Sequence, residues 1–557
     1  MTACRAAAPA APRDAALALW PVDAEVWLPQ LTVHARISGP FAATRCALAR
    51  NAQELALSAR SFGFDAELAL GPGQNRVTAR CWDGAGRMLS SQSVVYLNRA
   101  ESSGAASLQT APAVTQVSWL DDAVLYGVVP PLYGAPPLKA VTKALPALAE
   151  LGVSALWLSP LFATPSGDFG YAVTDYFTVR SDYGSDDDLR ALVASAHALG
   201  LKVLLDFVPN HTSAQHRYFR QAEAFGERSH YYGFYQRDAS GKSEHYFDWQ
   251  HLPNLAYGNP EVRAWLTAAS LHWLRAFDID GYRVDAAWGI AQRQPTFYDL
   301  WSAQLKATHP AVLIAEASAR DPFYEQHGFD ASYDWSNELG HWAWSEAFAS
   351  EHGMGARLEA AVMATERSTP EPARVLRFLN NNDTGARFVT RHGVPLTRVA
   401  TVLLLTLPGI PCLYSFDEVG GEFEPYSALS PLEEPQHPEL RALHRQLIAL
   451  RHALPALRGP QLTFIASNNP ELAVYVRPAV AGGTAALVAL NFSSLPQRVE
   501  LARPADFEPG VELEDLLDGT RRIGRSKALI LDLPPDGYVL LVPRTRRAQP
   551  ASARGAQ

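Results

Sequence analysis

Cysteine is scarce in this chain, whose 557 residues include only Cys4, Cys46, Cys81 and Cys412. No two of them have the Cys-x-x-Cys spacing on which common zinc and redox motifs depend. A single disulfide between Cys46 and Cys81 is compatible with the sequence, which does not establish it. The cysteines therefore give no sign of a zinc or redox centre.

A long apolar run and a leader peptide are also lacking. The most apolar stretch, residues 399–414, is interrupted by Pro408 and Pro411 and is too short to span a bilayer. Residues 1–21 are rich in Ala and Pro but contain no apolar core of the kind that a signal peptide needs. On the premise that Met1 is the true start, we predict a soluble, cytoplasmic protein with no membrane partner.

Positive charge is not in excess. The 48 Lys and Arg residues against 57 Asp and Glu residues give a net charge of -9, whereas binding to nucleic acid normally needs a basic surface. No internal repeat and no glycine-rich phosphate loop stands out. Nucleic acid is therefore not an expected partner, and the oligomeric state stays undetermined.

Apolar and aromatic residues, by contrast, are abundant. Hydrophobic residues make up 48% of the chain and charged residues 19%, which predicts two to four domains with large cores and excludes a fibrous or disordered protein. The 13 Trp, 20 Tyr and 23 Phe residues suit flat apolar ligands and suit large cores equally well.

Residues 20–99 contain short alternating runs separated by turn signals such as Gly71-Pro72-Gly73. The clearest runs are residues 25–28, 31–35 and 76–82. This spacing predicts a small antiparallel β-sandwich, and the pattern of residues 75–86 resembles bacterial immunoglobulin-like modules. We predict that residues 1–19 are disordered and that the Ala- and Ser-rich residues 100–113 are a linker.

Buried strand-like runs alternate with amphipathic helices in residues 114–454. Continuous apolar strands with helices between them predict a parallel sheet covered on its outer face. Eight such strands in one domain predict a (β/α)8 TIM barrel, an α/β fold. The expected strands are residues 124–129, 154–159, 202–208, 281–285, 312–316, 329–334, 374–379 and 411–414.

Two helix caps support this alternation. Ser185 precedes three acidic residues and an apolar-periodic run, and Asp188 occupies the capping-box position. Asn259 similarly precedes Pro260, which suits the first position of a helix over residues 262–277.

Residues 212–258 form a connection far too long for a plain barrel, and they predict an inserted subdomain over the barrel mouth. Its aromatic density argues against disorder, although most of these rings are expected simply to pack the insertion against the barrel. The rings belong to Tyr218, Phe219, Tyr231, Tyr232, Phe234, Tyr235, Tyr246, Phe247 and Trp249.

Alternating runs return at residues 472–476, 485–490, 528–531 and 537–542. They predict that residues 455–543 form a C-terminal antiparallel β domain. Residues 544–557 are basic and rich in Ala, and we predict that this tail is disordered.

Polar residues close several of the expected barrel strands. Because function in a TIM barrel sits at the carboxyl ends of the strands, these residues should share one pocket. They are Asp206, Asn210 and His211 after the third strand, Arg283 and Asp285 on the fourth, Glu316 on the fifth, and Asn381, Asn382 and Asp383 after the seventh. Taken alone, Arg283 and Asp285 would also fit a structural salt bridge.

Three carboxylates, an arginine, a histidine and many aromatic residues favour a retaining glycoside hydrolase, which needs one ionised carboxylate and one protonated acid. We expect Arg283 to lower the pKa of Asp285 and keep this nucleophile ionised. Glu316 closes an apolar strand near other acids, so we expect a raised pKa and proton donation. Asp383 would bind sugar hydroxyls and stabilise an oxocarbenium-like transition state.

The stretches that contain these residues resemble the signature stretches of the α-amylase superfamily, glycoside hydrolase family thirteen. They are residues 206–211, 281–285, 315–316 and 381–383, together with residues 170–176, which are similar to a Gly-Tyr-Asp stretch of the family. The resemblance extends from about Val124 through the C-terminal β domain. It implies that Asp285 is the nucleophile, Glu316 the acid/base and Asp383 the stabiliser.

The same resemblance implies that the substrates are α-linked glucans, mostly α-1,4 with some α-1,6. The residues that it implies to hold the sugar are Tyr171, His211 and Arg283, with Asp206 and Asn210 in supporting positions.

Several positions depart from the family pattern. Asn382 stands where the family usually has histidine, and it can donate a hydrogen bond but carry no charge. Ala287, Trp288 and Gly289 replace the common Lys-His region, and Trp288 would either stack on acceptor sugars or pack the loop. Further departures are Ala172, Asn254 and Ala256. The triad is intact, and the linkage and chain-length preference stay open.

Calcium is the one metal that the resemblance raises, because Asn210 matches a position that binds structural calcium in many family members. Calcium takes six to eight oxygen ligands, and the remaining carboxylates cannot be identified in the insertion. The sequence therefore requires no cofactor, with a structural calcium at Asn210 as the alternative.

The main hypothesis is a retaining hydrolase of starch, maltodextrin or related α-glucans. The first alternative is a transglycosylase or an enzyme that isomerises maltose or trehalose with the same triad, and it would form longer products before reducing sugar rises. A non-catalytic carbohydrate-binding protein is a further alternative, against which the complete triad argues. The last is a structural partner protein, which would bind no glucan.

Overall fold

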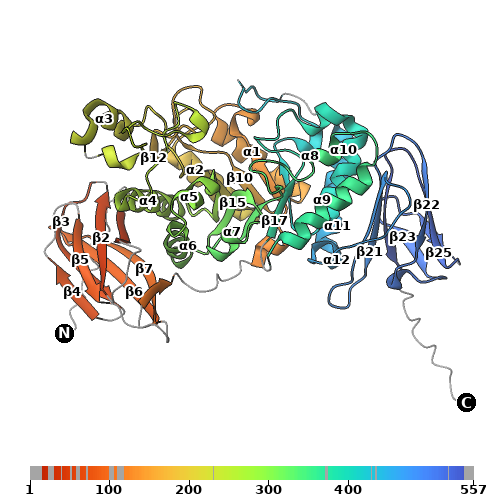
Figure 1. Cartoon of the computed structure of the whole chain (residues 1–557), viewed down its shortest axis with the longest axis horizontal. Helices are drawn as coiled ribbons and strands as arrows, with labels where there is room; N and C mark the ends of the chain where they lie inside the picture. Colours follow the sequence, from red (N-terminus) through yellow and green to blue (C-terminus); the bar gives the residue numbers. More distant parts are fainter. Residues whose placement is uncertain are drawn as a thin grey trace, which may run out of the picture.

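The computed structural model describes residues 16–22, 30–38, 40–50, 53–57, 63–69, 73–99, 106–109 and 118–544, except residues 230, 371–373, 428, 433–435 and 525. Three parts follow one another along the chain: an N-terminal β-sandwich, a central barrel and a C-terminal β-sandwich (Figure 1). No helix in these ranges is long and apolar enough to cross a membrane.

Eight parallel strands close into a barrel in the order β9-β10-β13-β14-β15-β16-β17-β18, with β18 pairing with β9. The predicted TIM barrel is confirmed, because continuous apolar runs on every strand can be buried on both faces. The strands are β9 (Leu125–Val128), β10 (Ala155–Leu158), β13 (Lys202–Phe207), β14 (Gly281–Val284), β15 (Val312–Ser318), β16 (Ala331–Tyr333), β17 (Arg374–Phe378) and β18 (Ile410–Tyr414).

The helices lie around this barrel, and the two predicted caps are present. The Ser185 side chain accepts a hydrogen bond from the Asp188 amide in a complete capping box, and Asn259 accepts from the Glu261 amide. The helices are α1 (Pro137–Leu151), α2 (Asp186–Ala198), α3 (Arg217–Phe225), α4 (Pro260–Phe277), α5 (Ala287–Arg293), α6 (Phe297–Thr308), α7 (Pro322–Gln326), α8 (Ser345–Phe348), α9 (Met354–Ser368), α10 (Phe388–Thr406), α11 (Pro438–Ala453) and α12 (Pro455–Arg458).

The N-terminal sandwich pairs a three-stranded sheet, β1-β2-β5, with a five-stranded sheet, β4-β3-β6-β7-β8, around an apolar core. Its strands are β1 (Ala16–Val22), β2 (Gln30–Ser38), β3 (Ala43–Arg50), β4 (Gln53–Leu57), β5 (Gly63–Ala69), β6 (Gly73–Asp83), β7 (Met88–Arg99) and β8 (Ala106–Gln109).

Two predicted boundaries of this sandwich are wrong. Strand β1 begins at Ala16, within the range predicted to be disordered, because its alternating residues pair with β2. Strand β8 lies in the predicted linker, because residues 106–109 add to the edge of β7. The expected run at residues 25–28 lies outside the described residues, as do residues 1–15 and 545–557.

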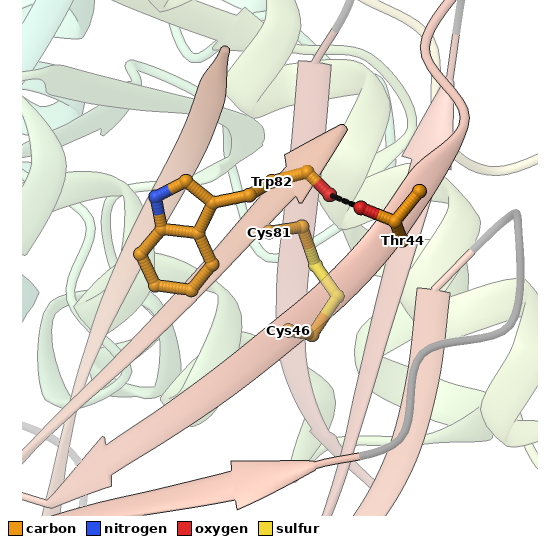
Figure 2. Close-up of a disulfide and its surroundings, with 4 residues drawn as sticks. All are labelled: Thr44, Cys46, Cys81 and Trp82. Atoms are coloured by element: carbon orange, nitrogen blue, oxygen red, sulfur yellow. Dashed lines mark hydrogen bonds between the residues drawn. A yellow bond between two sulfur atoms is a disulfide. The ribbon is translucent and has the colours of Figure 1, made fainter. Parts of the chain in front are cut away.

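Cys46 on β3 and Cys81 on β6 face each other in the strand register and form a disulfide (Figure 2). Both side chains are fully buried in the sandwich core. Nearby, the Thr44 hydroxyl donates to the Trp82 carbonyl at 3.2 Å. Disulfides persist mainly in oxidising compartments, and the location of this protein in the cell stays a prediction.

The N-terminal sandwich rests on two barrel helices. Strand β1 contacts α4 and strand β7 contacts α6 (Figure 1). In this contact the Arg275 guanidinium on α4 lies 3.4 Å from the Ser91 hydroxyl on β7. The sandwich therefore packs on the outside of the helical ring.

The C-terminal domain is a second antiparallel sandwich, as predicted, with its own core. One sheet has the order β19-β20-β21-β26-β23-β24, and β22 pairs with β25 in the other. The strands are β19 (Thr463–Phe464), β20 (Leu472–Arg477), β21 (Ala486–Asn491), β22 (Gln497–Ala502), β23 (Glu512–Asp515), β24 (Arg521–Ile523), β25 (Ala528–Leu533) and β26 (Tyr538–Pro543).

The long connection after β13 carries α3 and three short 3-10 helices, η3 (Gly226–Arg228), η4 (Tyr232–Phe234) and η5 (Tyr246–Asp248). Most of its rings pack together, as expected. For example, Tyr218 stacks on Tyr231 with ring centroids 3.8 Å apart, and Tyr218 also contacts Trp265 of α4. The rest of the small elements are β11 (Phe162–Ala163), β12 (Asp175–Val179), η1 (Ser118–Asp122), η2 (Pro130–Tyr133), η6 (Asp417–Val419) and η7 (Ala505–Phe507).

We expect removal of the disulfide to destabilise the N-terminal sandwich without changing catalysis. Breaking a bond that closes a 35-residue separation should lower the free energy of unfolding of the N-terminal sandwich by ~4 kcal/mol in a loop-closure model. Cys46→Ala with Cys81→Ala should therefore lower the first calorimetric transition and leave glucan turnover unchanged. Cys412→Ala serves as the cysteine control. A loss of turnover that matches the loss of stability would contradict this separation.

Candidate active site

The carboxyl ends of three neighbouring barrel strands, together with that of β17, bring the predicted polar residues together. Asp206 lies near the end of β13, Arg283 near the end of β14, Asp285 just beyond it and Glu316 within β15. These four side chains are buried, with exposed fractions of 0%, 1%, 7% and 6%. Asp383 follows β17 and is exposed at the pocket rim.

Arg283 is the centre of this arrangement. Its Nη1 donates to Asp206 Oδ1 at 2.8 Å and to Asp285 Oδ1 at 2.9 Å. Its Nη2 lies 3.1 Å from Glu316 Oε1, and its Nε donates to the Tyr333 hydroxyl at 2.9 Å. One guanidinium therefore orients three carboxylates and one phenol.

The turn after β14 orients Glu316 from the other side. Ala286 adopts a left-handed backbone conformation with φ of 45°, which a non-glycine residue rarely adopts and which costs free energy. In this conformation the Ala286 amide donates a hydrogen bond to Glu316 Oε2. The strained turn therefore connects the chain next to Asp285 directly to the Glu316 carboxyl.

The charge state differs from the sequence prediction at one position. Arg283 was expected to lower the pKa of Asp285, but burial is the larger effect and raises the pKa of Asp285 to about 7, with Asp206 and Asp383 also raising it. Arg283 does lower it, but one guanidinium serves three carboxylates, so its charge is shared. Burial raises the pKa of Glu316 well above its usual range, and the negative charges of Asp285 and Asp383 add to this rise. The pKa of Glu316 is therefore raised, which is the direction that proton donation needs.

Asp206 fixes one wall of the pocket. Its Oδ2 accepts hydrogen bonds from the Tyr171 hydroxyl at 3.0 Å and from Trp157 Nε1 at 3.2 Å, in addition to Arg283. The half-buried Tyr171 ring is thereby held at the pocket wall. Asp206 therefore holds Tyr171, Trp157 and Arg283 in place.

A proton count fixes the orientation of Asn382. The Tyr171 hydroxyl gives its only proton to Asp206, and the Tyr426 hydroxyl gives its only proton to Asp383 at 2.8 Å. Both hydroxyls must therefore accept from Asn382 Nδ2, at 3.0 and 2.6 Å. Asn382 Oδ1 is left buried without a hydrogen-bond partner among the described residues.

His211 lies beside Tyr171 but is bonded within the protein at both ring nitrogens. Its Nε2 donates to the Tyr171 carbonyl at 3.2 Å, so Nδ1 accepts from Asn210 Nδ2, also at 3.2 Å. Burial lowers the pKa of His211 to about 3, so the ring is neutral. In this structure His211 positions Tyr171, and the predicted direct contact with sugar stays a prediction.

An aromatic group forms the opposite wall. Tyr246 of the insertion stacks over His211 with centroids 4.9 Å apart and contacts Trp288 at 5.7 Å, and the exposed Phe247 contacts Trp288 at 5.3 Å. Burial and the charges of the nearby carboxylates, Glu316 first, raise the pKa of Tyr246. Trp288 is half-buried and packs against the insertion while it also faces a cleft.

This cleft has a volume of about 530 Å³. Ala317 and Ser318, the two residues after Glu316, line it, as does Trp288. Its other apolar lining residues include Phe323, Tyr324 and Trp335. The cleft therefore borders the carboxyl end of β15, the strand that carries Glu316.

The residues at Asn210 do not fit a calcium ion. Arg293 Nη2 donates to Asn210 Oδ1 at 2.5 Å and lies 3.4 Å from the Asn210 carbonyl, so a guanidinium already occupies the oxygen side of Asn210. Gly289 permits this approach, because a Cβ there would lie 2.4 Å from Asn210 Oδ1. Within the described part of the chain no three His, Cys, Asp or Glu side chains form a group that could hold a metal.

Sequence reasoning missed four residues of this site. Tyr333 and Trp157 lie on barrel strands whose apolar runs do not reveal which ring reaches the pocket. Arg293 belongs to a short helix, and its distance of 83 residues from Asn210 hides their pairing. Tyr426 lies in a loop without a motif, and no sequence signal identifies it. Tyr246 was noted only as one ring of an aromatic insertion.

Comparisons with known proteins agree with this geometry. The family model for the alpha-amylase catalytic domain matches residues 133–428. The chain is 29% identical over 418 residues to alpha-amylase MalA of Haloarcula japonica, covering 73% of this chain and 59% of that protein. It is 30% identical over 424 residues to neopullulanase 2 of Thermoactinomyces vulgaris, covering 72% and 70%. The chain thus spans less than two thirds of the length of the first relative.

A solved structure of an alpha-amylase from Anoxybacillus has a TM-score of 0.64 to this chain at 25% identity, covering 77% of this chain and 99% of that one. The fold of most of this chain is therefore a known architecture.

The Arg293 contact predicts stability without calcium. Arg293→Ala would leave Asn210 Oδ1 buried without its charged donor, at a cost of about 1.5–3 kcal/mol, and should lower the thermal midpoint and kcat/KM together. A chelator should leave the wild-type midpoint unchanged. Arg293→Lys is the matched control, since it keeps the charge without the fork. If chelator lowered the thermal midpoint of the wild type and Ca²⁺ restored it, the conclusion that calcium does not fit at Asn210 would be refuted.

The buried carboxylates predict a pH profile. The active form has Asp285 ionised and Glu316 protonated, so kcat/KM should rise with pH through the raised pKa of Asp285 and fall through the raised pKa of Glu316. The acid limb is therefore expected near pH 7 rather than near 4. Measuring kcat/KM from pH 4 to 10 tests this. A plateau in kcat/KM that already begins at pH 5 would mean that Arg283 lowers the pKa of Asp285 more than burial raises it.

Proposed function

The chain belongs to the alpha-amylase family, and from this premise we propose that it hydrolyses α-glucosidic bonds, mainly α-1,4, in starch, maltodextrin or related α-glucans. The configuration at the anomeric carbon is retained through a covalent glucosyl-enzyme intermediate. The two relatives are named an alpha-amylase and a neopullulanase, and their names support α-glucans as the substrate class.

One observation carries this proposal: two buried carboxyls contact the same guanidinium. Retaining hydrolysis needs a nucleophile and an acid at short separation, and Asp285 and Glu316 both contact Arg283. Burial raises the pKa of Glu316 well above its usual range, which suits the proton donor. Asp285, whose Oδ1 accepts directly from Arg283 Nη1, is then the nucleophile.

The reaction proceeds in two steps. Glu316 gives its proton to the glycosidic oxygen while an Asp285 oxygen attacks the anomeric carbon, so the leaving chain departs as an alcohol and a glucosyl ester forms. The Glu316 carboxylate then takes a proton from water, whose oxygen attacks the same carbon and releases Asp285. Arg283 steadies both carboxylates, and Asp383 at the rim supports the developing positive charge on the sugar ring.

The pocket offers groups suited to a glucosyl ring. The Tyr171 ring forms an apolar wall, and Asn382 Oδ1 is a buried acceptor without a partner in the described structure, which a sugar hydroxyl can satisfy. The leaving chain lies on the side of the acid, where the cleft with Trp288 begins.

Transglycosylation is the second candidate, and the cleft supports it. A second sugar held on Trp288 would stand where water must approach the glucosyl ester, and its hydroxyl would attack instead. The balance between water and sugar then depends on how firmly this aromatic wall binds an acceptor.

The test uses α-glucosyl fluoride and maltoheptaose. Wild-type enzyme should release the α-anomer first, as followed by proton NMR. Glu316→Ala should lose at least about 10³-fold of maltoheptaose turnover and far less with the fluoride, which needs no acid, and azide should restore its turnover as an α-glucosyl azide. Asp285→Ala should lose both activities, and any turnover that azide restores should give the β-glucosyl azide, because azide then displaces fluoride directly in place of the nucleophile.

Glu359→Ala is the control for a glutamate outside the pocket, on α9. Release of the β-anomer first would exclude the retaining mechanism. Inactivity of a folded wild-type sample on maltoheptaose, starch, pullulan and trehalose would exclude the proposed function altogether. Products longer than maltoheptaose, formed before reducing sugar rises, would identify transglycosylation as the main activity.

A further inference from the structure

We propose that Tyr426 closes the donor side of the pocket, so that the enzyme acts on chain ends rather than on internal bonds. The donor side is the part that holds the sugars on the non-reducing side of the cleaved bond. The inference rests on the proposed function and specifies the form of glucan that the site accepts.

Tyr426 is placed where a sugar hydroxyl would otherwise bind. Its hydroxyl donates to Asp383 and accepts from Asn382, with distances of 2.8 and 2.6 Å. These are the two polar side chains that follow β17 at the pocket. A tyrosine anchored to both of them occupies space next to the reacting ring.

The Tyr426 ring also connects two loops that are far apart in sequence. Its centroid lies 4.8 Å from that of Phe169 and 6.0 Å from that of Tyr171, both on the loop before β12. Tyr426 itself belongs to the loop after β18 and η6. The contact joins the two loops into one aromatic wall, formed by Phe169, Tyr171 and Tyr426.

The loop that carries Phe169 is held in place by its own hydrogen bonds. Asp168 Oδ1 accepts from the Gly170 amide at 2.7 Å and from the Ala172 amide at 3.1 Å. Arg180 Nη2, in turn, donates to the Asp168 carbonyl at 3.0 Å. The aromatic wall therefore has a fixed side on which Tyr426 rests.

Tyr426 adopts a conformation that its residue type disfavours. Its φ is 63°, in the left-handed region, although 52% of its surface is exposed and no core packing requires this backbone. Such strain is retained at functional sites where neighbouring contacts compensate for it. The contacts available here are the bonds to Asn382 and Asp383 and the ring contact with Phe169.

The two sides of the pocket are therefore unequal. On the side of Glu316, which protonates the leaving oxygen, a cleft of about 530 Å³ has room for several sugars of the leaving chain. On the side of Asn382 and Asp383, the aromatic wall blocks a continuing chain. A linear glucan can enter with its non-reducing end, whereas a cyclic glucan must extend past both sides and cannot.

The test compares linear with cyclic substrates. Wild-type enzyme should cleave reducing-end-labelled maltoheptaose from the non-reducing end, with glucose as the first product, and should cleave cyclomaltoheptaose at least about 100-fold more slowly. Tyr426→Ala should raise the cyclic-to-linear ratio of kcat/KM at least about 10-fold and release longer first products. Tyr426→Phe keeps the ring but loses the hydroxyl bonds to Asn382 and Asp383, so it should raise the ratio less than Tyr426→Ala does.

Phe225→Ala removes an equally exposed ring, 55% against 52%, from α3 and is the matched control. Wild-type cleavage of cyclomaltoheptaose at the rate of maltoheptaose would overturn the closed wall while leaving α-glucan hydrolysis intact. An unchanged ratio in Tyr426→Ala, with a thermal midpoint like that of wild type, would overturn the role of Tyr426. Inactivity of the wild type on both substrates would instead refute the proposed function.

Discussion

The buried guanidinium of Arg283 is the interaction on which the site depends. A charge this deep is tolerated only when it is paired and hydrogen-bonded, and Arg283 is paired with Asp206, Asp285 and Glu316. The reverse also holds, because three carboxyls in one dry pocket could not all be accommodated without that cation. Burial, together with the excess of acids over the single arginine, then raises the pKa of Asp285 and of Glu316. General-acid chemistry is thus a consequence of charge counting in a closed volume.

The barrel supplies the position, and the loops supply the selectivity. Neighbouring parallel strands end about 5 Å apart, so residues two strands apart in the sheet reach the same guanidinium without any special loop. By contrast, the aromatic side chains around the pocket come largely from segments between the strands: Tyr171 and Tyr426 from loops, Tyr246 from the insertion and Trp288 from α5. The conserved geometry of a barrel can therefore hold the same reacting groups while the loops change the shape of substrate that fits.

Much of the scaffold could be predicted from the sequence because its signals are local. Eight apolar runs, the Ser185 capping box and the Asn259 cap each depend on residues a few positions apart, and all of them correspond to elements of the structure. Edge strands carry weaker sequence signals. For this reason the residues of β8 were predicted to be a linker, and the first residues of β1 were predicted to be disordered. The residues at the strand ends could likewise be named, since a period of two and the barrel topology place them.

What could not be predicted depends on contacts between distant parts of the chain. The spacing of Arg283 and Asp285 shows that the two side chains are close. It does not show that Asp206 and Glu316 contact the same guanidinium. The prediction that the pKa of Asp285 is lowered was therefore wrong. Tyr426 is 43 residues from Asp383 and 44 from Asn382, with no motif around it.

The departure at Asn382 acquires a physical reason from the same network. The Tyr171 and Tyr426 hydroxyls donate their protons to Asp206 and Asp383. Each hydroxyl must therefore accept a hydrogen bond from Asn382, which lies between them. An amide nitrogen has two protons to give, whereas each nitrogen of an imidazole has at most one. Asparagine can therefore serve both tyrosines from a single atom and still present its oxygen to the pocket. The pair of tyrosines and the asparagine form one unit, and a histidine at position 382 would have to give up one of the two bonds.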